Sequence, residues 1–317
     1  MPALLIAAAV LAAQGVPPAR VSSGTAIRAE ANGALEAYLL TPAGRPKATM
    51  IIIPGSGPTD RDGNNPNAVK AAPYRKLTEA LVTRGVATLR IDKRGMYGSK
   101  AAGNPNEATF ADYDGDVRAW VETARRRTGQ KCVWVAGHSE GGLVALRAAG
   151  GPNVCGVVLL ATPGERLGDT IRKQLRANPA NAPVLASAEE ALGELEAGRR
   201  VAVTGLHPAL AQGLFNPAVQ GFMIELLAQD PAKLAAAVKR PMLIVQGGHD
   251  VQVGTVNGEV LKKAAPKASY VLFPAMNHAL SDAPAERGPN LATYAETDRP
   301  LTPGLTDRIA AFVTGRK

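Results

Sequence analysis

The sequence predicts an α/β protein in which a mostly parallel central sheet has helices on both faces. Short, nearly continuous apolar runs alternate along the chain with segments whose apolar residues recur at helical spacing. Few polar residues interrupt the apolar runs, which is typical of parallel strands buried on both faces. With 317 residues, of which 46% are hydrophobic, the chain is long enough to bury one large core.

The predicted elements follow one another in a regular order. An edge segment, 26–40, is expected to form one or two antiparallel strands. A helical pattern begins at Tyr74 and ends before Gly85, where a C-terminal cap belongs. A last helical pattern covers residues 305–313. The remaining strands are expected at residues 48–54, 86–91, 132–136, 156–160, 242–245 and 270–273.

The alternation of strands and helices stops at about residues 163–239. That stretch contains helical spacings of leucine and isoleucine and no convincing strand. A strand-free insertion over one end of a sheet is typical of a cap, although long peripheral helices are the alternative. We therefore expect one domain over residues 22–317 with a helical cap at about 163–239. Phe215 and Phe222 are the cap side chains expected to bind substrate.

The N-terminus, residues 1–15, resembles a secretion signal. An almost wholly apolar run is followed by small residues, so cleavage is expected after Ala12 or Gly15. The run lacks a basic residue at its start, and a docked apolar N-terminus is the alternative. It is too short for a transmembrane helix, and no cysteine follows it that could carry a lipid. A secreted or periplasmic protein without a stable membrane anchor is expected.

The formal net charge of +9 does not indicate a nucleic-acid partner. Basic residues are scattered, and the longest run, residues 125–127, precedes Gly129. Cations at that position fit the C-terminal end of a helix, where they interact favourably with the helix dipole. No basic stripe with interleaved aromatic residues is present.

The two cysteines, Cys132 and Cys155, do not have a metal-ligand spacing. Each begins an apolar run, so a disulfide is possible in an oxidising compartment if the two runs are neighbouring strands. Directly paired parallel strands often misalign the Cβ atoms for such a bond. The disulfide stays a hypothesis at this point, and neither a metal nor a cofactor is predicted.

The strongest chemical signal is Gly137-His138-Ser139-Glu140-Gly141, which lies directly after a predicted strand and before a helical pattern. This is the G-x-S-x-G nucleophile elbow in its expected context. The sharp turn presents the serine hydroxyl clear of its own backbone, and crowding there requires small residues two positions before and after it. The motif predicts Ser139 as nucleophile on an α/β-hydrolase fold, with the Glu140 amide as one oxyanion donor.

A serine nucleophile needs a base, usually histidine. His278 is the expected base because it lies in the loop after the last predicted strand, at the same edge of the sheet as Ser139. The other histidines are His138 in the elbow, His207 in the predicted cap and His249.

Asp250 is the expected acid, since it also follows a predicted strand. The chain order of Ser139, Asp250 and His278 is the order typical of this fold. Asp250 could instead be a turn or capping aspartate. In that case Asp282 is the next candidate.

The second oxyanion donor is expected from the glycine-rich turn after the strand at 48–54. Glycines there let the backbone approach a ligand closely and turn its N–H groups inward. The Ser56 amide is the candidate, and Gly55 or Gly57 could take its place by a one-residue shift. Gly55 and Gly57 are also expected to contact substrate.

From about Ala34 onward the chain resembles bacterial serine esterases of the α/β-hydrolase fold. The resemblance rests on PGSGPTDRDGN (54–64), IDKRGMYGS (91–99), GHSEGG (137–142), QGGHDVQV (246–253) and NHAL (277–280). It implies a carboxylesterase that acts on short acyl esters as small-molecule substrates, without metal or cofactor. It also implies that the site entrance is shaped by Asp60, Arg61, Asp62, Lys93 and Arg94.

Two alternatives to a carboxylesterase stay open. The nearest is another acyl hydrolase on the same fold, such as an aminopeptidase, lactonase or thioesterase. An aminopeptidase would need acidic cap residues to bind an amine, and the candidates are Glu189, Glu190, Glu194 and Glu196. A non-catalytic binding protein is the second alternative. Dehalogenase chemistry is disfavoured because the elbow carries serine, not aspartate.

Overall fold

The computed structural model describes residues 24–66, 69–177, 179–212 and 215–315, so the predicted signal peptide lies outside the described residues. An eight-stranded sheet with the order β1-β2-β4-β3-β5-β6-β7-β8 forms its centre. β1 and β2 are antiparallel edge strands, and the pairs from β4 to β8 are parallel. The strands are β1 (Thr25–Glu30), β2 (Ala34–Leu40), β3 (Ala48–Ile53), β4 (Val86–Ile91), β5 (Val133–His138), β6 (Val154–Leu160), β7 (Met242–Gly247) and β8 (Ser269–Phe273).

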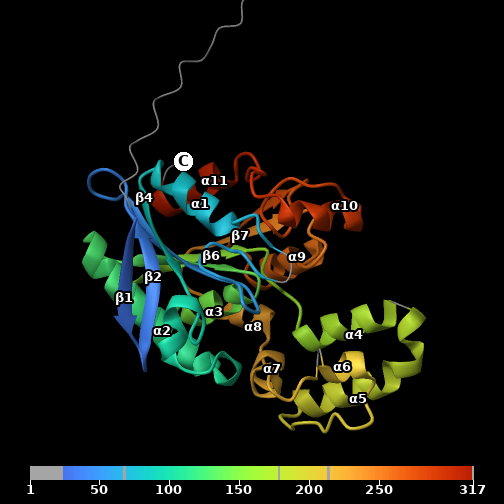
Figure 1. Ribbon diagram of the computed structural model, residues 1–317. Coiled ribbons are helices and arrows are strands. Elements are labelled where there is room, and N and C mark those ends of the chain that lie inside the picture. Colours follow the sequence, from blue (N-terminus) through green and yellow to red (C-terminus); the bar gives the residue numbers. More distant parts are fainter. Residues whose placement is uncertain (1–23, 67–68, 178, 213–214, 316–317) are drawn as a thin grey trace, which may run out of the picture.

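Helices connect these strands and lie on both sides of the sheet (Figure 1). The α-helices are α1 (Pro73–Val82), α2 (Phe110–Thr128), α3 (Glu140–Ala148), α4 (Leu167–Ala177), α5 (Leu185–Glu196), α6 (Pro208–Gln212), α7 (Gln220–Leu227), α8 (Pro231–Ala237), α9 (Thr255–Ala264), α10 (Arg287–Ala292) and α11 (Leu305–Thr314). Short 3₁₀ turns are η1 (Tyr97–Ala102), η2 (Pro105–Glu107), η3 (Pro179–Val184) and η4 (Thr293–Ala295). The predicted fold class, a mostly parallel sheet between helices with an antiparallel edge, is confirmed.

Each central strand contributes to two cores because its side chains alternate between the faces of the sheet. On β3, Ile51 and Ile53 belong to an apolar core that also contains residues of α2, α3 and α9. Met50 and Ile52 belong to a second core that contains residues of α1 and α11. Figure 1 shows α1 and α11 above the sheet and α2 and α3 below it. All six residues of β3 are buried, which explains why its sequence is an apolar run without polar alternation.

Between β6 and β7 the described residues form helices only, from α4 to α8, in the region of the predicted cap. α4, α5 and α7 share a small apolar core of their own that includes Leu192, Leu195 and Phe215. Figure 1 shows α4, α5 and α6 standing apart from the sheet, and α8 packs back against α3 and α9. Across the described ranges, no helix has both the length and the apolar composition that crossing a bilayer requires.

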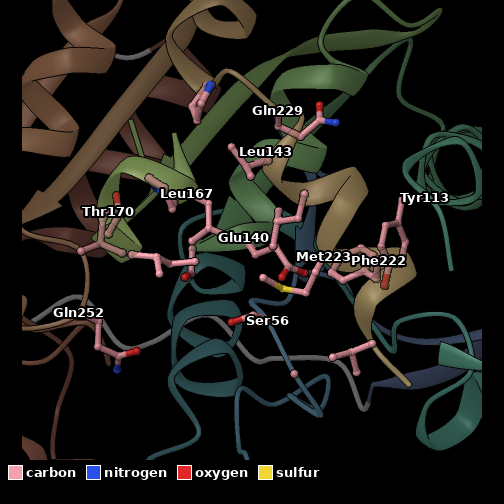
Figure 2. Close-up of a pocket in the computed structure, with 18 of the residues that line it drawn as sticks. Ser56, Tyr113, Glu140, Leu143, Leu167, Thr170, Phe222, Met223, Gln229 and Gln252 are labelled. Atoms are coloured by element: carbon pink, nitrogen blue, oxygen red, sulfur yellow. The ribbon is translucent and has the colours of Figure 1, made fainter. Parts of the chain in front are cut away.

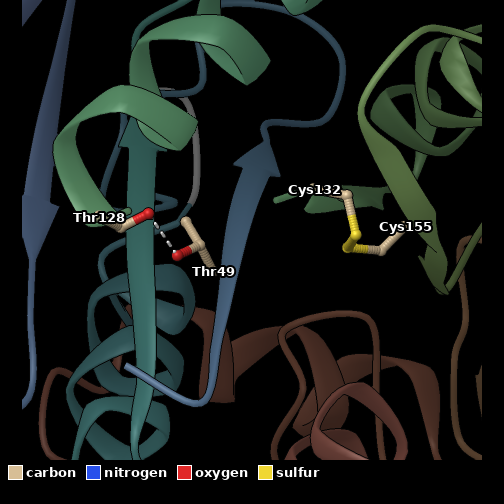
Figure 3. Close-up of a disulfide and its surroundings, with 4 residues drawn as sticks. All are labelled: Thr49, Thr128, Cys132 and Cys155. Atoms are coloured by element: carbon tan, nitrogen blue, oxygen red, sulfur yellow. Dashed lines mark hydrogen bonds between the residues drawn. A yellow bond between two sulfur atoms is a disulfide. The ribbon is translucent and has the colours of Figure 1, made fainter. Parts of the chain in front are cut away.

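The structure joins Cys132 and Cys155 in a disulfide with their Cα atoms 5.2 Å apart (Figure 3). The pairing of β5 with β6 is irregular here: Val133 and Trp134 are consecutive, but their partners on β6 are separated by Cys155. Cys155 is therefore an extra residue in the ladder, as in a β-bulge. The bulge removes the misalignment expected of two directly paired parallel strands, and the disulfide hypothesis agrees with the structure.

The double variant Cys132→Ala/Cys155→Ala is expected to lose about 3 kcal/mol of unfolding free energy, because the disulfide closes a loop across a sequence separation of 23 residues in the unfolded chain. Urea denaturation of the oxidised protein and the variant measures this loss. A reductant should destabilise the wild type and leave the double variant unchanged. Equal stability of the oxidised wild type and the variant would contradict the prediction.

Candidate active site

Ser139 lies in the turn between β5 and α3, with φ 54° and ψ −124°. A non-glycine residue at positive φ is strained, and such strain persists only where the surrounding structure enforces it. A Cβ added to Gly137 would lie 2.0 Å from the Gly141 carbonyl oxygen, and one added to Gly141 would lie 2.5 Å from that of Ile53. The two glycines of the motif are therefore required by close backbone approach, as the elbow predicts.

His278 and Asp250 meet in the loops that follow β8 and β7. The Nδ1 of His278 lies 2.8 Å from Asp250 Oδ2. The other carboxylate oxygen, Oδ1, accepts hydrogen bonds from the backbone N–H groups of Gln252 (2.9 Å) and Val253 (2.8 Å). These bonds fix the orientation of the carboxylate. The alternative acid, Asp282, accepts a hydrogen bond from the Thr302 hydroxyl instead (2.7 Å).

Ser139 borders two cavities. A small one of about 120 Å³ is also lined by His278, Gly55 and Ser56. A larger one of about 480 Å³ is lined by Ser139, Ser56 and Gly57 and extends toward the cap. The structure thus brings the predicted nucleophile, base and glycine-rich turn to one place at the carboxyl ends of the strands, where open α/β sheets bind ligands.

Lys93 holds the glycine-rich turn by two hydrogen bonds. Its Nζ donates hydrogen bonds to the carbonyl oxygens of Gly55 (2.6 Å) and Gly57 (2.8 Å). Because the C=O and N–H of a trans peptide point in opposite directions, the bond to Gly55 aims the Ser56 N–H away from Lys93. Burial lowers the pKa of the Lys93 ammonium. Lys93 also lines the larger cavity.

The other four charged residues that the resemblance placed at the site entrance are held in ion pairs and loop hydrogen bonds. Arg61 pairs with Asp92 and Glu36, and Asp60 accepts hydrogen bonds from two backbone N–H groups of its own loop. The remaining pairs are Arg90–Asp62 and Arg94–Asp116. The contacts of Asp60 and Arg61 fix the loop that follows the glycine-rich turn.

A buried series of hydrogen bonds, not predicted from the sequence, links the glycine-rich turn to His278. The Gly55 N–H donates to the Tyr74 hydroxyl (3.2 Å), which lies 2.8 Å from His138 Nδ1. The Nε2 of His138 lies 2.9 Å from the backbone carbonyl oxygen of His278. Because the carbonyl oxygen of His278 can only accept, the proton of a neutral His138 lies on Nε2. The Nδ1 atom then accepts a hydrogen bond from the Tyr74 hydroxyl.

This series of hydrogen bonds has two consequences for the site. Burial lowers the pKa of His138 to about 3, so His138 is neutral. It therefore carries one ring proton, as these hydrogen bonds require. The Gly55 N–H is already used, which removes Gly55 from the candidate oxyanion donors. Only the histidine preceding Ser139 hinted at this arrangement, because its partners lie 64 and 140 residues away.

Tyr74→Phe is expected to lower the unfolding free energy by about 1–3 kcal/mol, because it leaves the Gly55 N–H and the buried His138 Nδ1 without a partner. Thermal or urea unfolding measures the change. Tyr113→Phe is the matched control, since none of the described residues hydrogen-bonds to the Tyr113 hydroxyl. Equal losses in the two variants would show that the hydrogen bonds of Tyr74 do not contribute.

The larger cavity is mainly apolar (Figure 2). Its walls include Leu143 of α3, Leu167 of α4 and Phe222 and Met223 of α7. Phe222 therefore lies where substrate contact is expected. Phe215 does not: its side chain is fully buried in the core of the cap, so we withdraw it from the substrate-binding candidates.

The acidic cap residues mostly pair with arginines of the cap itself. The pairs are Glu189–Arg176, Glu194–Arg199 and Glu196–Arg172. The carboxylates of these three glutamates are already paired with arginines and do not bind a substrate amine. This weakens the argument for an aminopeptidase. In the described part of the chain, no cluster of three or more His, Cys, Asp or Glu side chains is arranged to hold a metal ion.

Residues 50–287 match the α/β hydrolase family, and the chain belongs to that family. A curated relative, esterase EstD of Thermotoga maritima, is 27% identical over 238 residues. The match covers 74% of this chain and 54% of EstD, so the chain spans about half the length of that relative.

Solved structures with the same fold include two further esterases. The Pyrococcus furiosus esterase Pf2001 has a TM-score of 0.54 at 16% identity, covering 92% of this chain and 91% of its own. Est1E from Butyrivibrio proteoclasticus, solved with ferulic acid bound, has a TM-score of 0.56 at 18% identity, covering 91% and 96%. At these identities the likeness concerns the fold.

Proposed function

We propose that the protein is a serine carboxylesterase that hydrolyses small acyl esters through Ser139, His278 and Asp250. The observation that carries the proposal is the strained elbow at Ser139, which opens into the same small cavity as a His278 imidazole held by Asp250. Esterase EstD, with which the chain shares 27% identity, supports the same reaction class.

In the proposed mechanism, His278 Nε2 takes the Ser139 proton as the serine oxygen attacks the ester carbonyl carbon. Asp250 accepts the Nδ1 proton of His278 in a hydrogen bond, which holds the required tautomer and stabilises the imidazolium. The Ser56 and Glu140 N–H groups stabilise the negative charge that develops on the carbonyl oxygen.

Collapse of the tetrahedral intermediate breaks the bond to the alcohol, which leaves with the proton from His278. Water then attacks the acyl-enzyme, with His278 acting as base once more, and the carboxylic acid is released as Ser139 regains its proton. No step requires a metal or a cofactor.

Hydrolysis of a 4-nitrophenyl ester series, from acetyl to dodecanoyl, tests the proposal. We expect turnover, with the highest kcat/KM for short acyl chains, and covalent labelling of Ser139 by a fluorophosphonate, located by mass spectrometry. Labelling without turnover of any ester would redirect the search to lactones, thioesters and peptides. Absence of both would favour a binding protein.

We also propose that the protein works in the periplasm or outside the cell after loss of residues 1–15. The Cys132–Cys155 disulfide supports this, because disulfides persist mainly in oxidising compartments. N-terminal sequencing of the protein from a native host tests it: a start at residue 13 or 16 is expected, and an intact Met1 would contradict the proposal.

A further inference from the structure

Glu140 has a buried side chain for which the mechanism has no use. Its backbone N–H is a proposed oxyanion donor, but its carboxylate lines the larger cavity. The residue is only 8% exposed. Across the described ranges, no residue donates a hydrogen bond to that carboxylate. The carboxylate oxygens open onto the cavity, so the donor to them is expected from a molecule bound there.

The surroundings of Glu140 narrow the chemistry of that partner. Figure 2 shows Glu140 in the middle of the cavity, with Leu167 and Thr170 on one side and Phe222 and Met223 on the other. Burial raises the pKa of the Glu140 carboxyl, and the nearby Lys93 charge opposes the rise. Lys93 already supplies one positive charge here, so a second cation from a ligand would be repelled. A neutral hydrogen-bond donor is the better match.

The position of His278 decides which half of an ester reaches Glu140. The proton of the imidazolium must pass to the leaving alcohol oxygen, so the alcohol lies beside His278. His278 lines the small cavity, whereas Glu140 lines the larger one. The acyl chain therefore extends from Ser139 into the larger cavity and past Glu140.

We propose that the preferred substrates are esters whose acyl group carries a hydroxyl within an otherwise apolar chain, and that this hydroxyl donates a hydrogen bond to the Glu140 carboxylate. The inference rests on the proposed esterase function. The apolar walls bind the hydrocarbon part, and the single buried carboxylate selects the hydroxyl. A site built to hydrogen-bond a substrate hydroxyl discriminates strongly against an analogue that lacks it.

The test compares methyl hexanoate with analogues that carry a hydroxyl on the second, third or last carbon of the acyl chain, and with methyl 6-aminohexanoate. Hydrolysis is followed by pH-stat, and the readout is the ratio of kcat/KM for each analogue to that for methyl hexanoate. The proteins compared are wild type, Glu140→Leu, Glu140→Gln and Thr170→Val. Thr170→Val removes a different polar group from the same cavity.

For wild type we expect the best hydroxylated ester to exceed methyl hexanoate by about tenfold or more, the typical effect of a hydrogen bond to a charged group. In Glu140→Leu the ratio should fall to one or below. In Glu140→Gln it should fall to an intermediate value, and in Thr170→Val it should be retained. Because each ratio refers to the same protein, a general loss of activity does not affect it.

Other outcomes overturn the inference in distinguishable ways. Hydrolysis of methyl hexanoate without a preference for any hydroxylated ester would remove the inference and leave the esterase function standing. Preference for the amino ester would show that Glu140 binds a cationic group and not a hydroxyl, which contradicts the inference. Hydrolysis of no ester would overturn both proposals. If Glu140→Leu does not fold, as judged by thermal unfolding, an undiminished ratio in Glu140→Gln would overturn the role of Glu140.

Discussion

Ser139→Ala is expected to lower kcat for ester hydrolysis by about five to six orders of magnitude, because the variant has no nucleophile to form an acyl-enzyme. Residual turnover would come from the oxyanion donors and substrate binding, which the substitution leaves intact. The fold should be retained, since alanine and serine have the same backbone requirements at the strained φ of this position.

Steady-state kinetics with a 4-nitrophenyl ester measure this loss, with circular dichroism as a check on folding. Ser187→Ala makes the same chemical change on α5, where the serine hydroxyl donates to a backbone carbonyl of the cap (3.0 Å). Full activity of folded Ser139→Ala would refute the assignment of the nucleophile. A comparable loss in Ser187→Ala would point to an indirect effect on stability.

Asp250→Asn is expected to lower kcat by about four orders of magnitude. The reason lies in the two backbone N–H groups, from Gln252 and Val253, that bind Oδ1. In the variant the amide oxygen must stay toward these donors, so the amide NH₂ faces His278 Nδ1. The imidazole is then driven to the tautomer with its proton on Nε2, which cannot accept the Ser139 proton.

Asp282→Asn is the matched control for this prediction, because Asp282 was the alternative acid in the sequence. Its carboxylate accepts from the Thr302 hydroxyl, which an asparagine oxygen can replace. We expect Asp282→Asn to retain kcat within about threefold, because the hydrogen bond with Thr302 is kept and no proposed catalytic group is altered. A larger loss in Asp282→Asn than in Asp250→Asn would reverse the assignment.

The sequence by itself determined the fold class and predicted the candidate catalytic residues, because both depend on local patterns. Apolar runs such as β3 indicate burial on both faces of the sheet. Glycines two positions before and after Ser139 indicate a crowded turn. The loops after parallel strands meet at one edge of the sheet. Chain order was therefore enough to place Asp250 and His278 near one another.

Only the tertiary structure decided which groups contact one another across long sequence separations. The bulge on β6 makes the Cys132–Cys155 disulfide possible, and a one-residue shift in pairing has no signature in either strand alone. Phe215 and Phe222 are equally apolar in sequence, but only packing of the cap helices buries one in the cap core and exposes the other to the cavity.

The same reason applies to the charged and polar groups around Ser139. Lys93 binds carbonyls 36 and 38 residues away, and Tyr74 and His138 connect the glycine-rich turn to the backbone of His278. Hydrogen bonds of this kind depend on distance and direction in space. Residue types and local periodicity do not encode either, so these contacts emerge only when the strands and loops are assembled around one core.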